Sequence, residues 1–387
     1  MKLRRIINAS GAVTRLGGAL MPEAVLRAHN EAAEVSVSME ELQAAAARRI
    51  AEVCDTESGL VTSGAAAGLT LGAAAILASH DLGRMERLPH CEGFPSEFVI
   101  AREQRNGYDH AVRAAGARLV EVGMNEPVAG SGVRRTEAWE YEAAIGENTA
   151  GVLYVYGPNS SPPLAEVVAV AQRHQLPVLV DAAGELPPRE NLQSIPATGA
   201  DLVAFSGGKA IRGPQATGIL CGKRELIASA ALQMLDMDDH FDLWNPPPDF
   251  IDKSKFAGMP RHGIGRALKV AKEDIAALLS ALDLFTSGTY DAELPQARQQ
   301  LQTIAHALAN SPADCTLQEP PATDSPRLVV SVRDAAKAFE ICRALRDGEP
   351  SIYVGHGQLA EGKLVIDPLC LDDAGATILA ERLQQMI

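Results

Sequence analysis

The chain has 387 residues, of which 47% are hydrophobic and 22% are charged, so it is a folded globular protein rather than a disordered one. This length exceeds the roughly 100–200 residues of one typical compact domain, which predicts a larger and a smaller domain. The net charge of −14 disfavours nucleic acid as a partner, and no stretch reaches the roughly 18 apolar residues that span a membrane.

The N-terminal residues predict an irregular arm followed by helices. Two glycine turns interrupt the first stretch, and a helix begins near Pro22. A second helix is predicted for residues 39–54, where apolar residues recur at helical spacing. We therefore treat residues 1–50 as an N-terminal arm and helix.

A regular alternation of strand and helix patterns follows. Short apolar runs predict strands at residues 97–101, 118–122, 149–156, 177–181, 201–206 and 218–221. Helical patterns lie between them, at residues 108–115 and 164–174. Strands that alternate with helices are typical of βαβ units, so residues 51–285 are expected to form a large α/β domain with a mostly parallel sheet.

The C-terminal part differs in kind. A proline-rich segment at residues 245–260 is followed by a long helical pattern from about 265 to 285. Beyond it, two strands and two amphipathic helices are predicted, at residues 328–332, 362–366, 335–346 and 372–386. Residues 286–387 are therefore expected to form a small α+β domain.

Two patterns in the large domain suggest a site for a phosphorylated, cationic ligand. Ser63, Gly64 and Ala65 open an Ala-rich helical pattern, and the N–H groups of a helix start bind phosphate; a plain helix start is the alternative. Asp181 ends an apolar strand, at the sheet edge where α/β proteins bind ligands. Its carboxylate would suit the protonated nitrogen of a pyridine ring, or it could simply cap a helix.

A third pattern supplies a lysine. The strand at residues 201–206 ends in Ser206, and Gly207, Gly208 and Lys209 follow. The glycines permit a sharp turn, after which the lysine projects over the sheet edge, although a solvated surface lysine is the alternative. A glycine-rich loop that begins at Arg212 would lie near the same site.

These features occur in the order expected of enzymes that hold pyridoxal 5′-phosphate (PLP) as a Schiff base. A phosphate-type helix start precedes the strand-end Asp181, and Lys209 lies 28 positions after that aspartate. Taken together, they predict PLP bound at Lys209, which would lose its proton in a partly desolvated site.

The motifs INASGAVTRLGG, DAAGELPP and SGGKAIRGPQATG resemble the selenocysteine synthase-like family of fold-type I PLP enzymes. The resemblance runs from about Ile6 to Leu383 and is nearest to the D-glucosaminate-6-phosphate ammonia-lyase branch. It implies the fold-type I transferase fold, with a sheet of the seven-stranded type and helices on both faces, and a homodimer or larger assembly.

The resemblance also implies roles for individual residues. Lys209 would form the Schiff base and act as acid and base at Cα, with Asp181 on the pyridine nitrogen. The remaining cofactor contacts would come from Ala183 against the ring, Asn159 near O3′, the turn that contains Gln104 and Arg105, and a phosphate site of Ser63, Gly64, Ala65 and Ser206. The N-terminal loop, with Asn8, Ser10 and Thr14, resembles a segment that approaches the site of a neighbouring subunit and contacts substrate.

Two departures from the family pattern bear on the substrate. Bacterial selenocysteine synthases carry an additional N-terminal domain for tRNA, whereas the INASGAV motif here begins at Ile6, which makes Ser-tRNA a poor candidate. Related enzymes also place a carboxylate-binding arginine after a Pro-x-Ile pattern, and the matching residues 350–357 contain none.

Four further residues could contact the substrate or could be ordinary surface residues: Arg212, Arg261, Arg266 and His356. Arg212, Arg261 and Arg266 could bind an anionic substrate or be solvated arginines. His356 could transfer a proton or be a loop histidine without a chemical role. No metal site is expected, and six scattered cysteines without a CxxC pair, together with no apolar leader after Met1, indicate a cytoplasmic protein.

The leading hypothesis is a lyase. Lys209 would remove the Cα proton of a small, hydroxylated amino acid, and loss of the β-substituent would yield a 2-oxo acid and ammonia. A racemase or epimerase would instead invert optical rotation, and a β-hydroxy amino acid aldolase would release an aldehyde. Less favoured are a tRNA-dependent selenium transferase and a non-catalytic binding protein on the same scaffold.

Overall fold

The computed structural model describes residues 3–130, 132–319 and 325–387, which divide into two compact units. We call Glu23–Leu186 with Glu190–Leu282 the large unit. The small unit comprises Pro187–Arg189, Asp283–Ile387 and the described part of Met1–Pro22. The N-terminal arm thus belongs to the same unit as the C-terminal residues.

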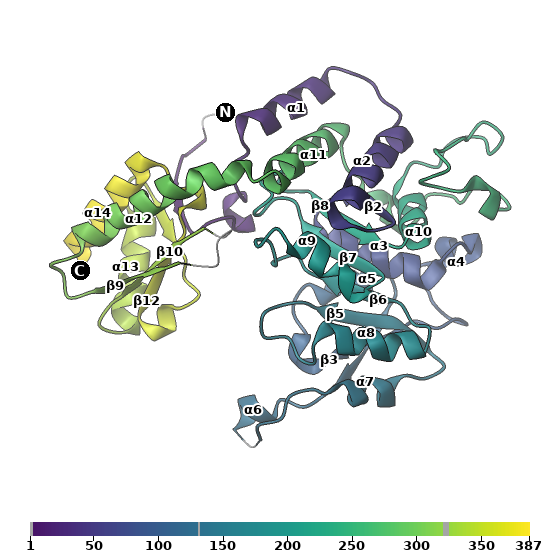
Figure 1. Ribbon diagram of the computed structural model, residues 1–387, viewed down its shortest axis with the longest axis horizontal. Helices are drawn as coiled ribbons and strands as arrows, with labels where there is room; N and C mark the ends of the chain where they lie inside the picture. The colour runs from purple at the N-terminus through teal and green to yellow at the C-terminus, as the bar shows by residue number, and fades with distance from the viewer. Residues whose placement is uncertain (1–2, 131, 320–324) are drawn as a thin grey trace. The chain divides into compact units, whose positions relative to one another are not determined.

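The large unit is built on a seven-stranded sheet, which Figure 1 shows among its helices. The strand order is β2 (Ser58–Thr62), β8 (Gly218–Gly222), β7 (Leu202–Ser206), β6 (Val178–Asp181), β5 (Thr149–Val155), β3 (Glu97–Ala101) and β4 (Arg118–Val122). Strand β8 is antiparallel to both of its neighbours, while the other strands run parallel to one another. The predicted mostly parallel sheet is confirmed.

Helices cover both faces of this sheet. Leu220 of β8 faces α3 (Ala65–Ala78), where a Cβ on Gly68 would lie 3.8 Å from the Leu220 Cβ. The next residue, Cys221, points to the opposite face, where its thiol meets Cys54 of α2 (Met39–Cys54). Successive residues of one strand thus contact helices on opposite faces.

The small residues of α3 are explained by close packing. All but two of its 14 residues are buried, and a Cβ on Gly72 would lie 2.9 Å from Leu179 Cδ1 of β6. Ala and Gly therefore let α3 lie directly on the sheet. The other α-helices of the large unit are α1 (Glu23–Ala33), α4 (Leu82–Arg87), α5 (Asp109–Ala114), α6 (Glu126–Ala129), α7 (Ala138–Ala144), α8 (Leu164–Arg173), α9 (Asn191–Ser194), α10 (Arg224–Met234) and α11 (Lys272–Thr286), the last of which runs on into the small unit.

The outer edge of β2 is closed by a buried side chain. Gln43 of α2 is fully buried and donates to the Val61 carbonyl over 3.0 Å, while its own carbonyl accepts the Val61 N–H over 3.1 Å. The side-chain amide thereby replaces the missing neighbouring strand. The sequence pattern did not predict β2, because Gly59 interrupts a short apolar run.

The predicted single helix from 265 to 285 is wrong. A 3₁₀ helix, η5 (Ile264–Leu268), is followed by a break, and α11 begins at Lys272. A Cβ on Gly265 would lie 2.9 Å from the Gln233 carbonyl oxygen, so η5 packs tightly on α10. The Leu268 carbonyl accepts a hydrogen bond from the Ser63 hydroxyl over 3.0 Å, and these tertiary contacts end the helix there.

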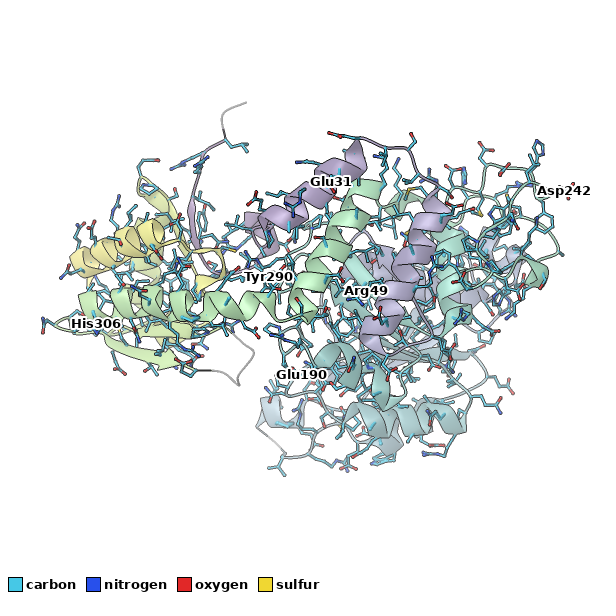
Figure 2. The ribbon with its side chains drawn as sticks, turned by 45° about the horizontal axis from the view of Figure 1, so that its top comes forward. Glu31, Arg49, Glu190, Asp242, Tyr290 and His306 are labelled. Atoms are coloured by element: carbon cyan, nitrogen blue, oxygen red, sulfur yellow. The ribbon has the colours of Figure 1, made fainter. Side chains whose placement is uncertain are left out.

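The small unit holds two short sheets. β10 (Arg327–Ser331) lies between β9 (Asp314–Gln318) and β12 (Lys363–Ile366), antiparallel to both, and β1 (Ile7–Ala9) pairs in parallel with β11 (Ile352–Val354). Its helices are α12 (Leu294–Ala307), α13 (Ala335–Asp347) and α14 (Asp373–Met386). Figure 2 shows Tyr290 just before α12 and His306 at the far end of that helix.

None of the helices in the described residues combines the length and the apolar content needed to span a bilayer.

We expect Gln43→Leu to destabilise the protein by about 2 kcal/mol or more, because it buries the Val61 N–H and carbonyl without partners. Chemical denaturation of the wild type and the variant measures this loss. Gln193→Leu is the matched control: that exposed amide donates one hydrogen bond, to the Val53 carbonyl, and its loss should cost less than about 1 kcal/mol. Equal stabilities of the two variants would contradict the edge-closing role of Gln43.

Candidate cofactor-binding site

The reversed strand β8 brings the predicted phosphate residues to one sheet edge. Its first residue, Gly218, is paired with Thr62 at the end of β2 and with Ser206 at the end of β7. A Cβ on Gly218 would lie 2.5 Å from the backbone of Gly64 and Ala65, so only glycine permits this approach. Ser206 and the start of α3 therefore flank the same strand.

The start of α3 is open for an anion. Its N-cap, Gly64, has φ +98° and makes no side-chain cap, and nothing lies within 4 Å of a Cβ placed on it. Ala65 and the next residues hence offer N–H groups that no cap occupies. The Ser63 hydroxyl donates to Leu268, so Ser63 would meet a phosphate chiefly through its backbone.

Lys209 leaves a turn that only glycines allow. The Gly207 N–H donates to the Thr217 carbonyl over 2.9 Å. A Cβ on Gly207 would lie 2.3 Å from Thr217 Oγ1, and one on Gly208 would lie 2.7 Å from Gln215 Cα. The Arg212 N–H then donates to the Lys209 carbonyl over 3.0 Å, and this closes the turn. The two glycines therefore fix where the half-buried Lys209 emerges.

Two carboxylates face the lysine. Asp181 is 8% exposed, and its Oδ1 accepts the Ala183 N–H over 3.1 Å. Burial raises the pKa of Asp181, and both the Ala183 hydrogen bond and the charge of Lys209 partly oppose that rise. Burial likewise raises the pKa of Glu185, which Lys209 lowers and Asp181 raises. Lys209 Nζ lies 4.0 Å from the position of a Cβ on Gly184, so the lysine lies over the turn between these two acids.

These features fit PLP. A buried carboxylate whose pKa is raised by desolvation suits a cationic ring nitrogen, whose charge would stabilise the carboxylate. The uncapped start of α3 suits the phosphate group, and Ser206 lies one strand away from it. A half-buried lysine that lies over the turn after β6 suits the aldehyde carbon. The proposed ring-nitrogen and Schiff-base residues thus come together from β6 and the turn after β7.

Other predicted cofactor contacts are held by protein groups. The Gln104 amide accepts the Val155 N–H over 3.0 Å and donates to the Ser161 carbonyl over 3.4 Å. Arg105 forms ion pairs with Asp109 and Glu121. Asn159 is exposed, and its carbonyl accepts a hydrogen bond from Arg135 over 2.6 Å.

The arginines predicted to bind an anionic substrate differ in placement. Arg266 forms a 2.6 Å ion pair with Asp236. The Arg261 side chain is 88% exposed and lies 3.7 Å from a Glu86 carboxylate oxygen. Arg212 belongs to the turn after Lys209 and has φ +63°, in the left-handed region.

The remaining candidates lie in the small unit. Asn8 donates to the Gly11 carbonyl over 3.0 Å and accepts the Ser10 N–H over 2.9 Å, so its amide shapes its own loop. The Ser10 hydroxyl is buried without a hydrogen-bond partner in the described residues, and Thr14 is exposed. His356 is exposed and contacts Arg15.

From the sequence, Glu185 could orient a neighbouring group or be a plain loop carboxylate, and the structure places it at the site. It follows Asp181 by four positions, and its N–H donates to the Ala182 carbonyl over 3.1 Å in the turn after β6. That turn brings Glu185 back towards Lys209. The signal was present in the DAAGE motif, but a loop carboxylate looks the same in sequence whether or not the loop turns back.

Comparison with known proteins decides the family. The sequence model of the L-seryl-tRNA selenium transferase family matches residues 108–237. The chain is 30% identical over 99% of its length to a 5′-C-glycyluridine monooxygenase-decarboxylase from a Streptomyces species, covering 90% of that protein. The chain belongs to the selenocysteine synthase-like family. This confirms the resemblance of its motifs.

Relatives in this family extend to a solved structure. The chain is 28% identical to D-glucosaminate-6-phosphate ammonia lyase of Salmonella typhimurium, over 99% of this chain and 96% of that one. A structure of D-glucosaminate-6-phosphate ammonia-lyase matches with a TM-score of 0.80 at 29% identity, again over 99% and 96% of the two chains. A structure described as SPT with PLP shares the fold, with a TM-score of 0.55 at 14% identity over 98% and 87%. The protein is a fold-type I, PLP-dependent enzyme.

Among the residues that the structure describes, no group of three or more histidine, cysteine or acidic side chains is arranged to hold a metal ion.

We expect Asp181→Asn to affect the apoprotein and the cofactor-bound protein in opposite directions. Burial raises the pKa of Asp181 above its ordinary 3.8, so the folded state binds this proton more readily than the unfolded chain. Charging Asp181 therefore costs native stability as the pH rises through the window from 3.8 to the raised pKa. Unfolding of both apoproteins in mildly acidic and neutral buffer should show the variant gaining relative to the wild type as the pH rises.

Added PLP should stabilise the wild type more than Asp181→Asn. Asp201→Asn is the matched control, because the Asp201 carboxylate is also buried but accepts the Val178 N–H and pairs with Lys223. Asp201→Asn should lose stability at neutral pH, because the charged carboxylate is already paired with Lys223 in the folded protein. An Asp181→Asn apoprotein that loses stability relative to the wild type as the pH rises would contradict this assignment.

Proposed function

We propose that the protein is a PLP-dependent lyase that acts on a small, hydroxylated amino acid and releases a 2-oxo acid and ammonia. The observation that carries the proposal is Lys209, half-buried at the sheet edge beside the buried Asp181. The likeness to an ammonia-lyase over nearly the whole chain supports the class of reaction.

Each residue at the sheet edge has a proposed task. Bound PLP supplies an electron sink for the bond that breaks at Cα. Lys209 would hold the cofactor and would move the proton at Cα of the substrate. Asp181 would keep the ring nitrogen protonated, and Ala183 would contact the ring. The N–H groups at the start of α3, with Ser206, would hold the phosphate.

Electrons and atoms balance without an oxidant. The electron pair of the Cα–H bond forms the Cα–Cβ double bond as the β-hydroxyl leaves with a proton as water. Hydrolysis of the resulting enamine consumes one water molecule and releases ammonia with the 2-oxo acid, so no net water is gained or lost. Glu185, which faces Lys209 and whose pKa is raised by burial, is the acid that we propose to protonate the leaving hydroxyl.

The proposal includes a homo-oligomer in the cytoplasm. Several large apolar side chains of the large unit are exposed from the end of β4 to the first turn of α7, which is unusual for a surface that stays in water: Met124, Val128, Val133 and Trp139. The six cysteines form no disulfide, as fits a reducing compartment. Arg212, Arg261 and Arg266 stay proposed substrate contacts.

The test is product formation from a panel of D- and L-amino acids by the PLP-loaded protein. Release of a 2-oxo acid and ammonia is expected, and Lys209→Ala should lower turnover at least about a hundredfold. Lys223→Ala, an exposed lysine that pairs with Asp201 at the end of β8, is the matched control and should keep its activity. Aldehyde release or inverted optical rotation would replace the lyase by an aldolase or a racemase, and full turnover in Lys209→Ala would overturn the assignment of that residue.

A further inference from the structure

Three cationic or ionisable side chains gather around one tyrosine in the small unit. The guanidinium carbons of Arg15 and Arg346 each lie 5.5 Å from the centre of the Tyr353 ring. A guanidinium nitrogen of Arg15 also lies 3.2 Å from Nδ1 of His356. Arg15 belongs to a 3₁₀ turn near the N-terminus, Arg346 to the last turn of α13 and Tyr353 to β11, so distant parts of the chain assemble the cluster.

No carboxylate balances this cluster among the described residues. The charged groups that act on His356 are Arg15 and Arg346, with no carboxylate among them, and Nε of Arg346 is buried without a hydrogen-bond partner among the described residues. Burial lowers the pKa of His356, and the charges of Arg15 and then Arg346 lower it further. A chain with 49 acidic and 35 basic residues has ample carboxylates for surface arginines, so this local excess of positive charge calls for a ligand.

The chemistry of the cluster selects the ligand. Guanidinium groups present planar sets of N–H donors that match the oxygens of carboxylate or phosphate, and stacking on an aromatic ring holds them in place. A buried donor without an acceptor costs free energy until an acceptor arrives. We propose that Arg15, Arg346 and His356, gathered around Tyr353, form a binding site for the oxyanion group of a small carboxylate or phosphate ester.

The cluster shares no residue with the proposed cofactor phosphate site, which the start of α3 and Ser206 would provide in the large unit. The inference does not depend on the reaction at Lys209, because every residue in it belongs to the small unit. It also supplies arginines where residues 350–357, which would hold a carboxylate-binding arginine in related enzymes, have none.

Binding can be measured on the full-length, PLP-loaded protein by NMR of its histidine rings, with the His356 signal assigned through His356→Gln. Inorganic phosphate and acetate are titrated separately at constant ionic strength, with chloride as the balancing anion. We expect a saturable shift of the His356 signal. A lower midpoint for phosphate would identify a phosphate ester as the ligand class, and a lower midpoint for acetate would identify a carboxylate.

Arg346→Gln should raise the midpoint about tenfold or more, since a charge-assisted hydrogen bond is lost. Arg343→Gln removes the same charge from an exposed position on the same helix and should leave the midpoint unchanged. The exposed Arg15→Gln gives a second variant that is expected to fold normally and should also weaken binding. A shift that never saturates in the wild type, or equal midpoints in the wild type and both cluster variants, would overturn the proposal.

Discussion

The close approach of Gly218 to the backbone of Gly64 and Ala65 is the constraint on which the site depends. Because β8 runs against its neighbours, it starts where β2 and β7 end. The start of α3 and the Ser206–Lys209 turn must therefore flank a single glycine, and any side chain there would separate them. Gly207 and Gly208, in the turn before Lys209, also have no room for a side chain, because they pack closely against the segment that leads into β8.

The electrostatics of the site follow from burial. Asp181 ends a strand at the centre of the sheet, where desolvation raises the pKa of its carboxyl group and the charge of Lys209 offsets only part of that rise. A second cation beside Asp181 would stabilise its charged carboxylate, and the protonated ring nitrogen of the cofactor would be such a cation. The carboxylate of Asp181 is thus only partly compensated in the apoprotein, and cofactor binding would supply the missing positive charge.

The sequence sufficed where local pattern decides the structure. The short apolar runs predicted the buried strands. Asp181 and Lys209 could be selected because each follows such a run. The division of the chain into residues 1–50, 51–285 and 286–387 stays a prediction. The long helix from 265 failed, because the Ser63–Leu268 hydrogen bond that interrupts its pattern joins residues about two hundred positions apart.

Long-range contacts account for the other gaps. Gln43 closes the edge of β2 only because α2 packs there, and Glu185 reaches Lys209 only because its turn folds back. The Arg15–His356 contact joins residues separated by 341 positions, so neither residue could be linked to the other from sequence spacing. Candidate site residues at strand ends could therefore be predicted from the sequence, whereas those that depend on loop contacts required the structure.

The most direct test of the account is borohydride reduction of the PLP-loaded protein, followed by peptide mass spectrometry. We expect a visible absorption band that disappears on reduction and a pyridoxyl group on the peptide that contains Lys209. A pyridoxyl group on a different lysine, or no band and no adduct after PLP is added, would contradict the central claim that Lys209 holds the cofactor.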